Sequence, residues 1–411
     1  MKIEEKYSEI MSYREYRSPK RQARERKERR KRKINNSDVI LSSADHSLIV
    51  IVIFLVVIGL LAIFSATAPK CLREGVNLAT FLVKQLLYVG VGSFALIFFA
   101  HFFDYKKLEK YNKPFLWFVI ALLIILQFTP LGVTINGAKR WINLGIIQLQ
   151  PSEFAKPLFC MLLATLFKDK INLNTILKNL GIVIPMLAII LLVLKQPNLS
   201  MAVILSMTTL ALYIAGRGSW IPIWIGSGVL GAGILTMLPK LLHGYQMDRI
   251  TVWLNPGSDA LGKGYNIIQS LIAFATGGFS GTGYGSSIQK LAYLPECHTD
   301  FIFAIIAEEF GFLGCVFVVG LFVALVHRGM RIAKRCPDMY GKLLAIGITF
   351  VFGFQGFLNM SVASSLLPVT GVTLPFISYG GTSIIVSLAM IGILLNISKQ
   401  RIKRIRTENE Q

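Results

Sequence analysis

The chain has 411 residues, of which 54% are hydrophobic and only 16% are charged, and its mean hydropathy is +0.59. A soluble domain carries about 25% charged residues, so this composition excludes an ordinary soluble fold and predicts a polytopic membrane protein. The net charge of +21 collects in the N-terminal tail, in short loops and in the segment Lys399–Arg406. Such runs are typical of solvated cytoplasmic flanks that attract anionic lipid, and we expect no binding to nucleic acid.

Hydropathy divides the chain into three parts. Residues 1–46 are too polar for a signal peptide, so they are predicted to form a basic cytoplasmic tail without order. Residues 47–398 form the transmembrane domain, and residues 399–411 form a second basic cytoplasmic tail. The five cysteines lack metal-binding spacing, and no disulfide framework is implied.

Apolar stretches long enough to cross about 30 Å of hydrocarbon, or most of it, predict an all-α fold with about ten transmembrane helices. They lie near residues 47–66, 84–103, 114–130, 151–168, 179–195, 200–216, 220–239, 301–327, 343–366 and 377–397. The loops expected on the tail side are the richer in Lys and Arg per residue, which predicts that both termini are cytoplasmic.

This topology places a large extracytoplasmic loop, about residues 240–300, between the seventh and eighth helices. Its many glycines and its mixed polar and apolar content favour an ordered, functional segment over a tether. Within it, residues 264–275 are predicted to form an amphipathic or re-entrant helix.

The stretch Leu294–Gly314 places a carboxylate, Asp300, where an apolar helix is predicted to begin, with Thr299 as its N-cap. At 100° per residue, a stripe of small residues lies below this carboxylate, and the opposite side is predicted to face lipid. The stripe comprises Ala304, Ala307, Gly311 and Gly314, and the opposite side comprises Phe301, Ile302, Ile305, Ile306, Phe312 and Leu313. The alternative is that Asp300 only complements the helix dipole.

Two further carboxylates, Glu308 and Glu309, lie inside the same apolar helix. At about 1.5 Å per residue they are roughly 12 Å from Asp300 along the axis. An ionised group at that depth costs at least about 2.5–3.5 kcal/mol. We therefore expect each of them to have a pairing partner or a wet cavity.

A second outer loop, residues 137–156, combines cations with a carboxylate. Glu153 and Lys156 are three residues apart, so they share a helix face and are predicted to pair. Lys139 and Arg140 offer cations to an anionic substrate; the alternative is an interfacial anchor with a structural ion pair. Separately, the Pro and Gly residues of 367–383 predict broken helix at membrane depth.

Five motifs in these segments together resemble the SEDS family (shape, elongation, division and sporulation) of peptidoglycan polymerases, which includes FtsW, RodA and SpoVE. They are Lys139-Arg-Trp-Ile, Gln150-Pro-Ser-Glu-Phe-Ala-Lys156, Tyr293-Leu-Pro-Glu, His298-Thr-Asp-Phe-Ile-Phe-Ala304 and Leu374-Pro-Phe-Ile-Ser-Tyr-Gly-Gly381. The resemblance spans about residues 47–400 and favours the FtsW-like branch. It departs from the family pattern at Asn198-Leu199-Ser200, where Asp-Leu-Gly is usual.

The resemblance implies a glycosyltransferase that joins disaccharide units of lipid II at the outer face of the bacterial cytoplasmic membrane, in cell division or cell-shape control. Asp300 matches the carboxylate that the family requires for catalysis. The other expected substrate contacts are Lys139, Arg140, Arg249, Glu296, Glu153, Lys156 and Gln269. A Mg²⁺ or Mn²⁺ ion could offset the diphosphate charge, but the sequence contains no strong metal motif.

The same resemblance implies partners, namely a class B penicillin-binding protein that cross-links the glycan and other membrane proteins of the divisome or elongasome. Two alternatives stay open at this point. One is a lipid II flippase, because transporters also contain intramembrane carboxylates and broken helices. The other is a non-catalytic scaffold for the penicillin-binding protein.

Overall fold

The computed structural model describes residues 39–41, 43–135, 137–143, 148–169, 177–216, 251–260, 262 and 264–402. Contacts divide the chain into two units, one made of Met1–Ser42 with Gln400–Gln411 and the other of Ser43–Lys399. In the first unit, strands β1 (Val39–Leu41) and β5 (Gln400–Ile402) pair antiparallel. The predicted span at 220–239 and the predicted substrate contact Arg249 lie outside the described residues.

Within the described part of the second unit, six helical stretches are long and apolar enough to cross a membrane. They are α3 (His46–Glu74), α4 (Thr80–Ile97) with the π-helix η2 (Phe98–Phe102), α5 (Tyr105–Leu108) with the 3-10 turn η3 (Glu109–Tyr111) and α6 (Asn112–Phe128), α14 (Ile302–Arg335), α15 (Met339–Ala363) and α16 (Gly381–Lys399). Two shorter apolar helices are α9 (Leu180–Lys195) and α10 (Leu199–Ala215), and α7 (Pro151–Phe167) is a further helix of this unit. The multi-span helical fold is therefore confirmed, without a full count of its spans.

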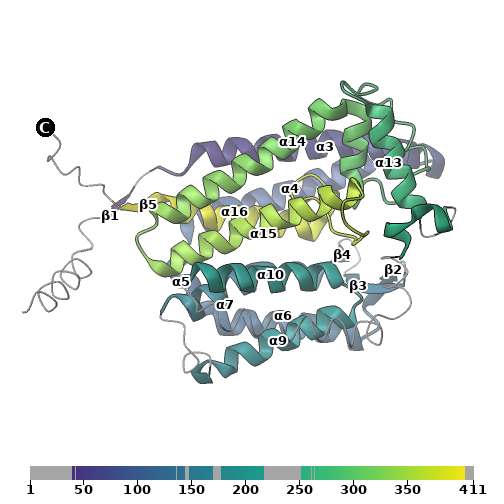
Figure 1. The fold of residues 1–411 in the computed structure, drawn as a ribbon. Helices are drawn as coiled ribbons and strands as arrows, with labels where there is room; N and C mark the ends of the chain where they lie inside the picture. Colours follow the sequence, from purple (N-terminus) through teal and green to yellow (C-terminus); the bar gives the residue numbers. More distant parts are fainter. Residues whose placement is uncertain are drawn as a thin grey trace, which may run out of the picture. The chain divides into compact units, whose positions relative to one another are not determined.

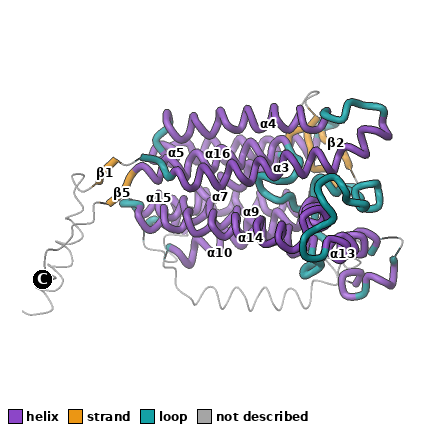
Figure 2. The backbone as a smooth tube through the Cα atoms, turned by 90° about the horizontal axis from the view of Figure 1, so that it is seen from above, coloured by secondary structure: helices purple, strands orange, loops and turns teal. Residues whose placement is uncertain are grey.

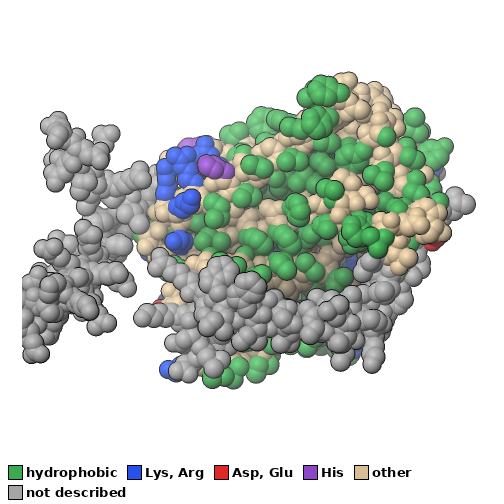
Figure 3. Space-filling model, in the orientation of Figure 1, with side chains coloured by type: hydrophobic (Ala, Val, Ile, Leu, Met, Phe, Trp, Pro, Cys, Tyr) green, Lys and Arg blue, Asp and Glu red, His purple; other side chains and the backbone are tan. Residues whose placement is uncertain are grey.

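The helices of this unit lie side by side (Figures 1 and 2), with α14 packed against α15 and α3, α4 against α16, and α7 against α15, α10 and α6. Close approach of α4 and α16 requires a glycine, because a Cβ on Gly392 would lie 2.5 Å from the Leu96 carbonyl oxygen. Hydrophobic side chains cover much of the visible face, and Lys and Arg gather at the end where α14 finishes (Figure 3). This pattern is typical of a bundle surrounded by hydrocarbon.

The two predicted outer loops contain more structure than the sequence indicated. Three strands, β2 (Gly132–Ile135), β3 (Ala138–Asn143) and β4 (Gln148–Leu149), form a small antiparallel sheet in the order β2-β3-β4. The sequence predicted only helices, so this sheet is an addition to the fold. In the large loop, the short turn η4 (Pro256–Asp259) precedes helix α13 (Tyr265–Gly277), which confirms the helix predicted at 264–275.

Helix α14 corrects three expectations. It begins at Ile302 with Phe301 as its N-cap and no side-chain cap, so Thr299 is not the cap. The helical geometry is interrupted at Gly311, whose φ of 64° and ψ of −161° are non-helical. The predicted stripe of small residues is therefore not continuous. The expected lipid-facing residues before the break are instead buried in the bundle, namely Phe301, Ile302, Ile305 and Ile306, whereas Phe312 and Leu313 beyond it are exposed. The break turns the two halves to different surroundings.

Candidate functional site

A cavity of about 1440 Å³ is lined by the two irregular segments 291–301 and 367–380 and by residues of α3, α4, β3, β4, α7, α9, α10, α13, α15 and α16. Its polar lining includes four basic residues, three carboxylates and several amides and hydroxyls. The charged members are Lys70, Lys84, Arg140, Lys195, Glu153, Glu296 and Asp300. Four predicted site residues therefore line one cavity: Arg140, Glu153, Glu296 and Asp300.

The backbone of Asp300 is held firmly although it precedes the helix. Asn359 Nδ2 donates to the Asp300 carbonyl oxygen at 2.8 Å and to the Val372 carbonyl oxygen at 2.6 Å. Ser378 Oγ donates to the preceding carbonyl, that of Thr299, at 2.6 Å. Segments 298–301 and 371–379 are thereby joined, and Asp300 has a fixed place in the cavity wall.

The Asp300 carboxylate and the Arg140 guanidinium converge on Gly371. A Cβ built there would lie 3.3 Å from Asp300 Oδ2 and 3.7 Å from Arg140 Nη1. Gly371 also has a φ of +68°, which L side chains rarely adopt. A glycine at this position therefore leaves room for both charged groups.

Arg140 is oriented by the C-terminal end of α9. Its Nε donates to the Gln196 carbonyl oxygen at 3.4 Å, and its Nη2 donates to the Pro197 carbonyl oxygen. Carbonyls at a helix C-terminus are the negative end of the helix dipole, which favours a guanidinium. Arg140 thereby contributes a fixed positive charge to the wall of the cavity.

Three lysines of the cavity lining were not predicted as site residues. Lys70 lies on α3, which continues past its predicted end at residue 66, and its Nζ is 5.3 Å from the Phe81 ring centroid. Lys84 lies on α4, and Lys195 ends α9 with its Nζ 5.2 Å from the Phe128 ring centroid. None of the three stands in a motif, so the sequence offered no signal for them.

An aromatic wall adjoins Lys70. The His298 ring lies 5.8 Å from the Phe81 ring and 5.8 Å from the Tyr379 ring, and the Tyr379 amide donates to the His298 carbonyl oxygen at 3.0 Å. Burial lowers the pKa of His298, although Glu296 opposes the shift. The neutral ring therefore serves as part of an apolar wall near neutral pH.

Glu153 and Lys156 form the ion pair that their spacing predicted, with 2.6 Å between Lys156 Nζ and Glu153 Oε2. Both side chains are buried. Lys156 Nζ also donates to Gln355 Oε1 at 2.9 Å, and Gln355 Nε2 donates to the Thr373 carbonyl oxygen at 2.9 Å. Glu153 thus lines the cavity, whereas Lys156 lies behind it and connects α7 to α15.

Asn198, where the sequence departs from the expected family pattern, caps a helix. Its Oδ1 accepts from the Met201 amide at 3.3 Å at the start of α10, and its Nδ2 lies 3.5 Å from Ser152 Oγ. A neutral amide performs this capping as well as a carboxylate does. Asn198 therefore provides the cap of α10 without adding a charge to the cavity lining.

Two other predicted contacts lie apart from the cavity lining. Lys139 Nζ donates to the carbonyl oxygens of Gln127 at 3.3 Å and Thr129 at 2.8 Å, so it caps the C-terminal end of α6. Gln269 lies on α13, of which Asn266 and not Gln269 reaches the cavity.

The cavity carboxylates are the side chains that could bind the expected divalent cation. Among the described residues, no three His, Cys, Asp or Glu side chains are grouped closely enough to hold a metal ion. Mg²⁺ is often bound by one or two carboxylates together with substrate phosphates. This chain could therefore supply a minority of the ligands, with Asp300 and Glu296 as the candidates.

Known proteins resemble this chain over most of its length. The family model for FtsW, RodA and SpoVE, described as "Cell cycle protein", matches residues 45–403. A protein named "Probable peptidoglycan glycosyltransferase FtsW" from Trichlorobacter lovleyi is 37% identical over 87% of this chain and 94% of its own length. "Stage V sporulation protein E" of Bacillus subtilis is also 37% identical, over 87% of this chain and 98% of its own length.

Solved structures extend the likeness to the fold. A chain from a structure described as "Structural coordination of polymerization and crosslinking by a peptidoglycan synthase complex" matches with a TM-score of 0.71 and 28% identity, covering 86% of this chain and 97% of that one. The rod shape determining protein RodA of Thermus thermophilus matches with a TM-score of 0.62 and 26% identity, covering 86% and 96% of the two chains. The multi-span chain described above therefore belongs to the FtsW, RodA and SpoVE family, the SEDS proteins.

Proposed function

We propose that the cavity beside Asp300 is where this chain, a SEDS peptidoglycan glycosyltransferase acting in cell division and cell shape, polymerises lipid II. The observation that carries the proposal is the convergence of the Asp300 carboxylate and the Arg140 guanidinium on Gly371, inside a cavity with further lysines. A carboxylate beside cations suits a reaction that needs a base for a hydroxyl and positive charge for a departing diphosphate.

The reaction assigns each group a role. Asp300 accepts the proton of the 4-hydroxyl of lipid II, and that oxygen bonds to the anomeric carbon of the growing strand. The bond from this carbon to the diphosphate breaks, and undecaprenyl diphosphate leaves with the electron pair. Arg140, Lys70, Lys84 and Lys195 are the cavity cations available to its negative charge. A divalent cation, when bound, would supply further charge neutralisation.

The two ends of the bundle differ in a way that supports an orientation in the membrane. The outer-loop sheet and α13 lie at the end of the bundle opposite α5 (Figure 1), and the basic residues Lys334 and Arg335 end α14. By the positive-inside rule this difference supports the proposed orientation, with the cavity at the extracytoplasmic face and both termini in the cytoplasm of the bacterial cell. A class B penicillin-binding protein is the proposed partner, since one solved relative comes from a peptidoglycan synthase complex that coordinates polymerisation and crosslinking.

The test is polymerisation of labelled lipid II by the full chain purified with its cognate transpeptidase, with and without Mg²⁺ or Mn²⁺. We expect wild-type protein to make polymer and Asp300→Asn to make none while folding normally, because the substitution is nearly isosteric. Asp104→Asn is the matched control, since Asp104 only caps the short helix α5. Equal polymer from wild type and Asp300→Asn would remove Asp300 from the chemistry, and no polymer from wild type beside an active partner would favour a flippase or scaffold.

A further inference from the structure

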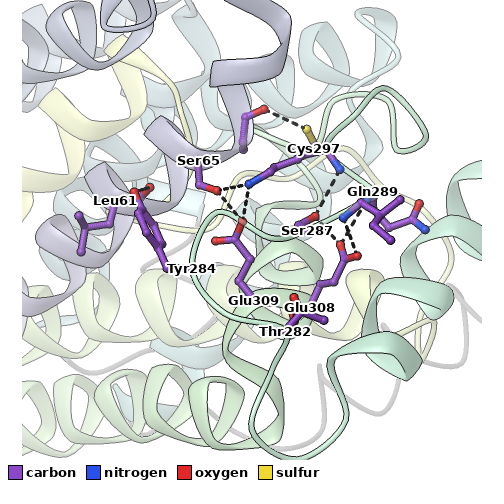
Figure 4. Close-up of polar contacts among 12 residues, drawn as sticks. Leu61, Ser65, Thr282, Tyr284, Ser287, Gln289, Cys297, Glu308 and Glu309 are labelled. Atoms are coloured by element: carbon purple, nitrogen blue, oxygen red, sulfur yellow. Dashed lines mark hydrogen bonds and ion pairs between the residues drawn. The ribbon is translucent and has the colours of Figure 1, made fainter.

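Two adjacent carboxylates that the proposed reaction does not use are buried at the end of the first half of α14. Glu308 is 0% exposed and Glu309 is 2% exposed, and neither lines the cavity. Both face the segment between α13 and α14, which carries Asp300 (Figure 4). The expectation that each has a polar partner is confirmed, and the partners all belong to this segment or to α3.

Glu309 holds the segment through an ion pair. Lys290 Nζ lies 2.8 Å from Glu309 Oε1 and donates to Ser65 Oγ on α3 at 2.8 Å, and the Ser65 hydroxyl in turn donates to Glu309 Oε1. All three side chains are buried. The pair therefore closes the chain between residues 290 and 309 into a loop and attaches it to a third element.

Glu308 holds the residues just before this lysine. Its carboxylate accepts from the Ile288 amide at 2.9 Å, from the Gln289 amide at 3.3 Å and from the Ser287 hydroxyl. These donors converge on the negatively charged Glu308 carboxylate, so their hydrogen bonds to it are charge-assisted.

The backbone around Gly311 completes the attachment. Amides of Thr282 and Gly283 donate to the carbonyl oxygens of Glu308 and Glu309 at 3.0 Å each, and the Phe312 amide donates to the Gly278 carbonyl oxygen at 2.9 Å. The helix break therefore exposes carbonyls and amides that pair with segment 278–283. Side chains and backbone fix this segment against the same point of α14.

We propose that Lys290, Glu308 and Glu309 are positioning residues that fix the segment carrying Glu296, His298 and Asp300 against the cavity. The inference rests on the proposed function, because turnover is one of its two readouts. A buried ion pair is weak evidence for stability, since apolar residues of similar volume replace such pairs with little loss. It does specify geometry, and Asp300 lies midway along the loop that this pair closes.

The decisive variant is Lys290→Met/Glu309→Leu in the full chain with its partner, which removes both charges and leaves neither buried alone. We expect the unfolding temperature to stay near that of wild type and the KM for lipid II to stay within about 2-fold of the wild-type value. We expect kcat to be about 10- to 100-fold lower, because misplacement of a reacting group slows the chemical step. Hydrogen exchange should also accelerate at the amides of Thr299 and Asp300, which donate to the Glu296 carbonyl oxygen at 3.2 Å each.

A second ion pair provides the matched control. Lys168 and Glu109 pair at the other end of the bundle with side chains about one-third exposed, so Lys168→Met/Glu109→Leu should leave turnover and exchange at residues 299–300 unchanged. Lys290→Arg keeps the charge and should retain most of the turnover.

Wild-type kcat and wild-type exchange in the folded Lys290→Met/Glu309→Leu protein would overturn the proposal. If that protein fails to fold, Ser65→Ala, which removes one hydrogen-bonding group and keeps the pair, decides by the same two readouts. If wild-type protein makes no polymer, the proposed function fails separately, and the exchange measurement alone decides the positioning role.

Discussion

At the scale of single residues, His298 is expected to make the stability of the folded chain depend on pH. Burial between Phe81 and Tyr379 lowers the pKa of His298 below its ordinary value of about 6.5. The unfolded chain therefore binds this proton more readily than the folded chain does, so the folded state loses stability as pH falls below about 6.5.

We expect the free energy of unfolding to decrease between about pH 7 and pH 5, and part of that decrease to vanish in His298→Gln. Thermal unfolding in detergent at several pH values measures the difference between the two proteins. An identical pH profile in both would show that His298 does not contribute.

Lys156 illustrates how one buried charge depends on another. Lys156→Met would leave the Glu153 carboxylate, 3% exposed, without its cation. Removing one partner of a buried pair typically costs about 3–5 kcal/mol. We therefore expect a clear loss of folded protein and a lower unfolding temperature, whereas Lys113→Met at an exposed position of α6 should change neither. Equal unfolding temperatures for the two variants would contradict the buried-pair interpretation.

At the scale of elements, the break in α14 predicts that alanine substitutions at two glycines of this helix have different effects on stability. Gly311→Ala places a side chain at φ +64°, ψ −161°, a region essentially restricted to glycine, and its Cβ would lie 2.4 Å from the Gly281 amide nitrogen. Backbone strain alone costs about 1–3 kcal/mol, and the clash adds to it. The expected result is a marked loss of thermal stability.

Gly320→Ala is the control on the same helix, because a Cβ there meets nothing within 4 Å. In a regular helix this change is neutral or stabilising by up to about 1 kcal/mol. Similar unfolding temperatures for the two alanine variants would show that the break does not require glycine.

Elements also differ in how far their sequence determines them. Long apolar runs predicted the spans near α3, α14, α15 and α16, because burial in hydrocarbon is set by composition and length. The end of α3 at Glu74 was missed, since Pro69 and Lys70 are typical of a loop when read alone. The break at Gly311 was missed because partners in segment 278–283 impose it.

The candidate site shows the same division. Asp300, Arg140, Glu153 and Glu296 stand in recognisable motifs, so the sequence located them, and the structure places all four around one cavity. Lysines at positions 70, 84 and 195 belong to no motif. They reach the cavity only through the packing of α3, α4 and α9, which no local pattern specifies.

At the scale of the whole molecule, the cavity wall combines segments far apart in the chain. Lys70 and Lys84 come from α3 and α4, the first two spans among the described residues. Thr382 and Ser383 come from α16, the last span among them, which packs against α4. The α4–α16 contact can form only after the residues between these two helices have been synthesised.

This distribution has a consequence for biosynthesis. A chain still emerging from the ribosome, with residues after 380 not yet inserted, holds its early lysines in the membrane without the final wall of the cavity. It therefore has no complete pocket for a lipid-linked diphosphate. Substrate binding in this cavity is therefore expected only after α16 has been inserted beside α4.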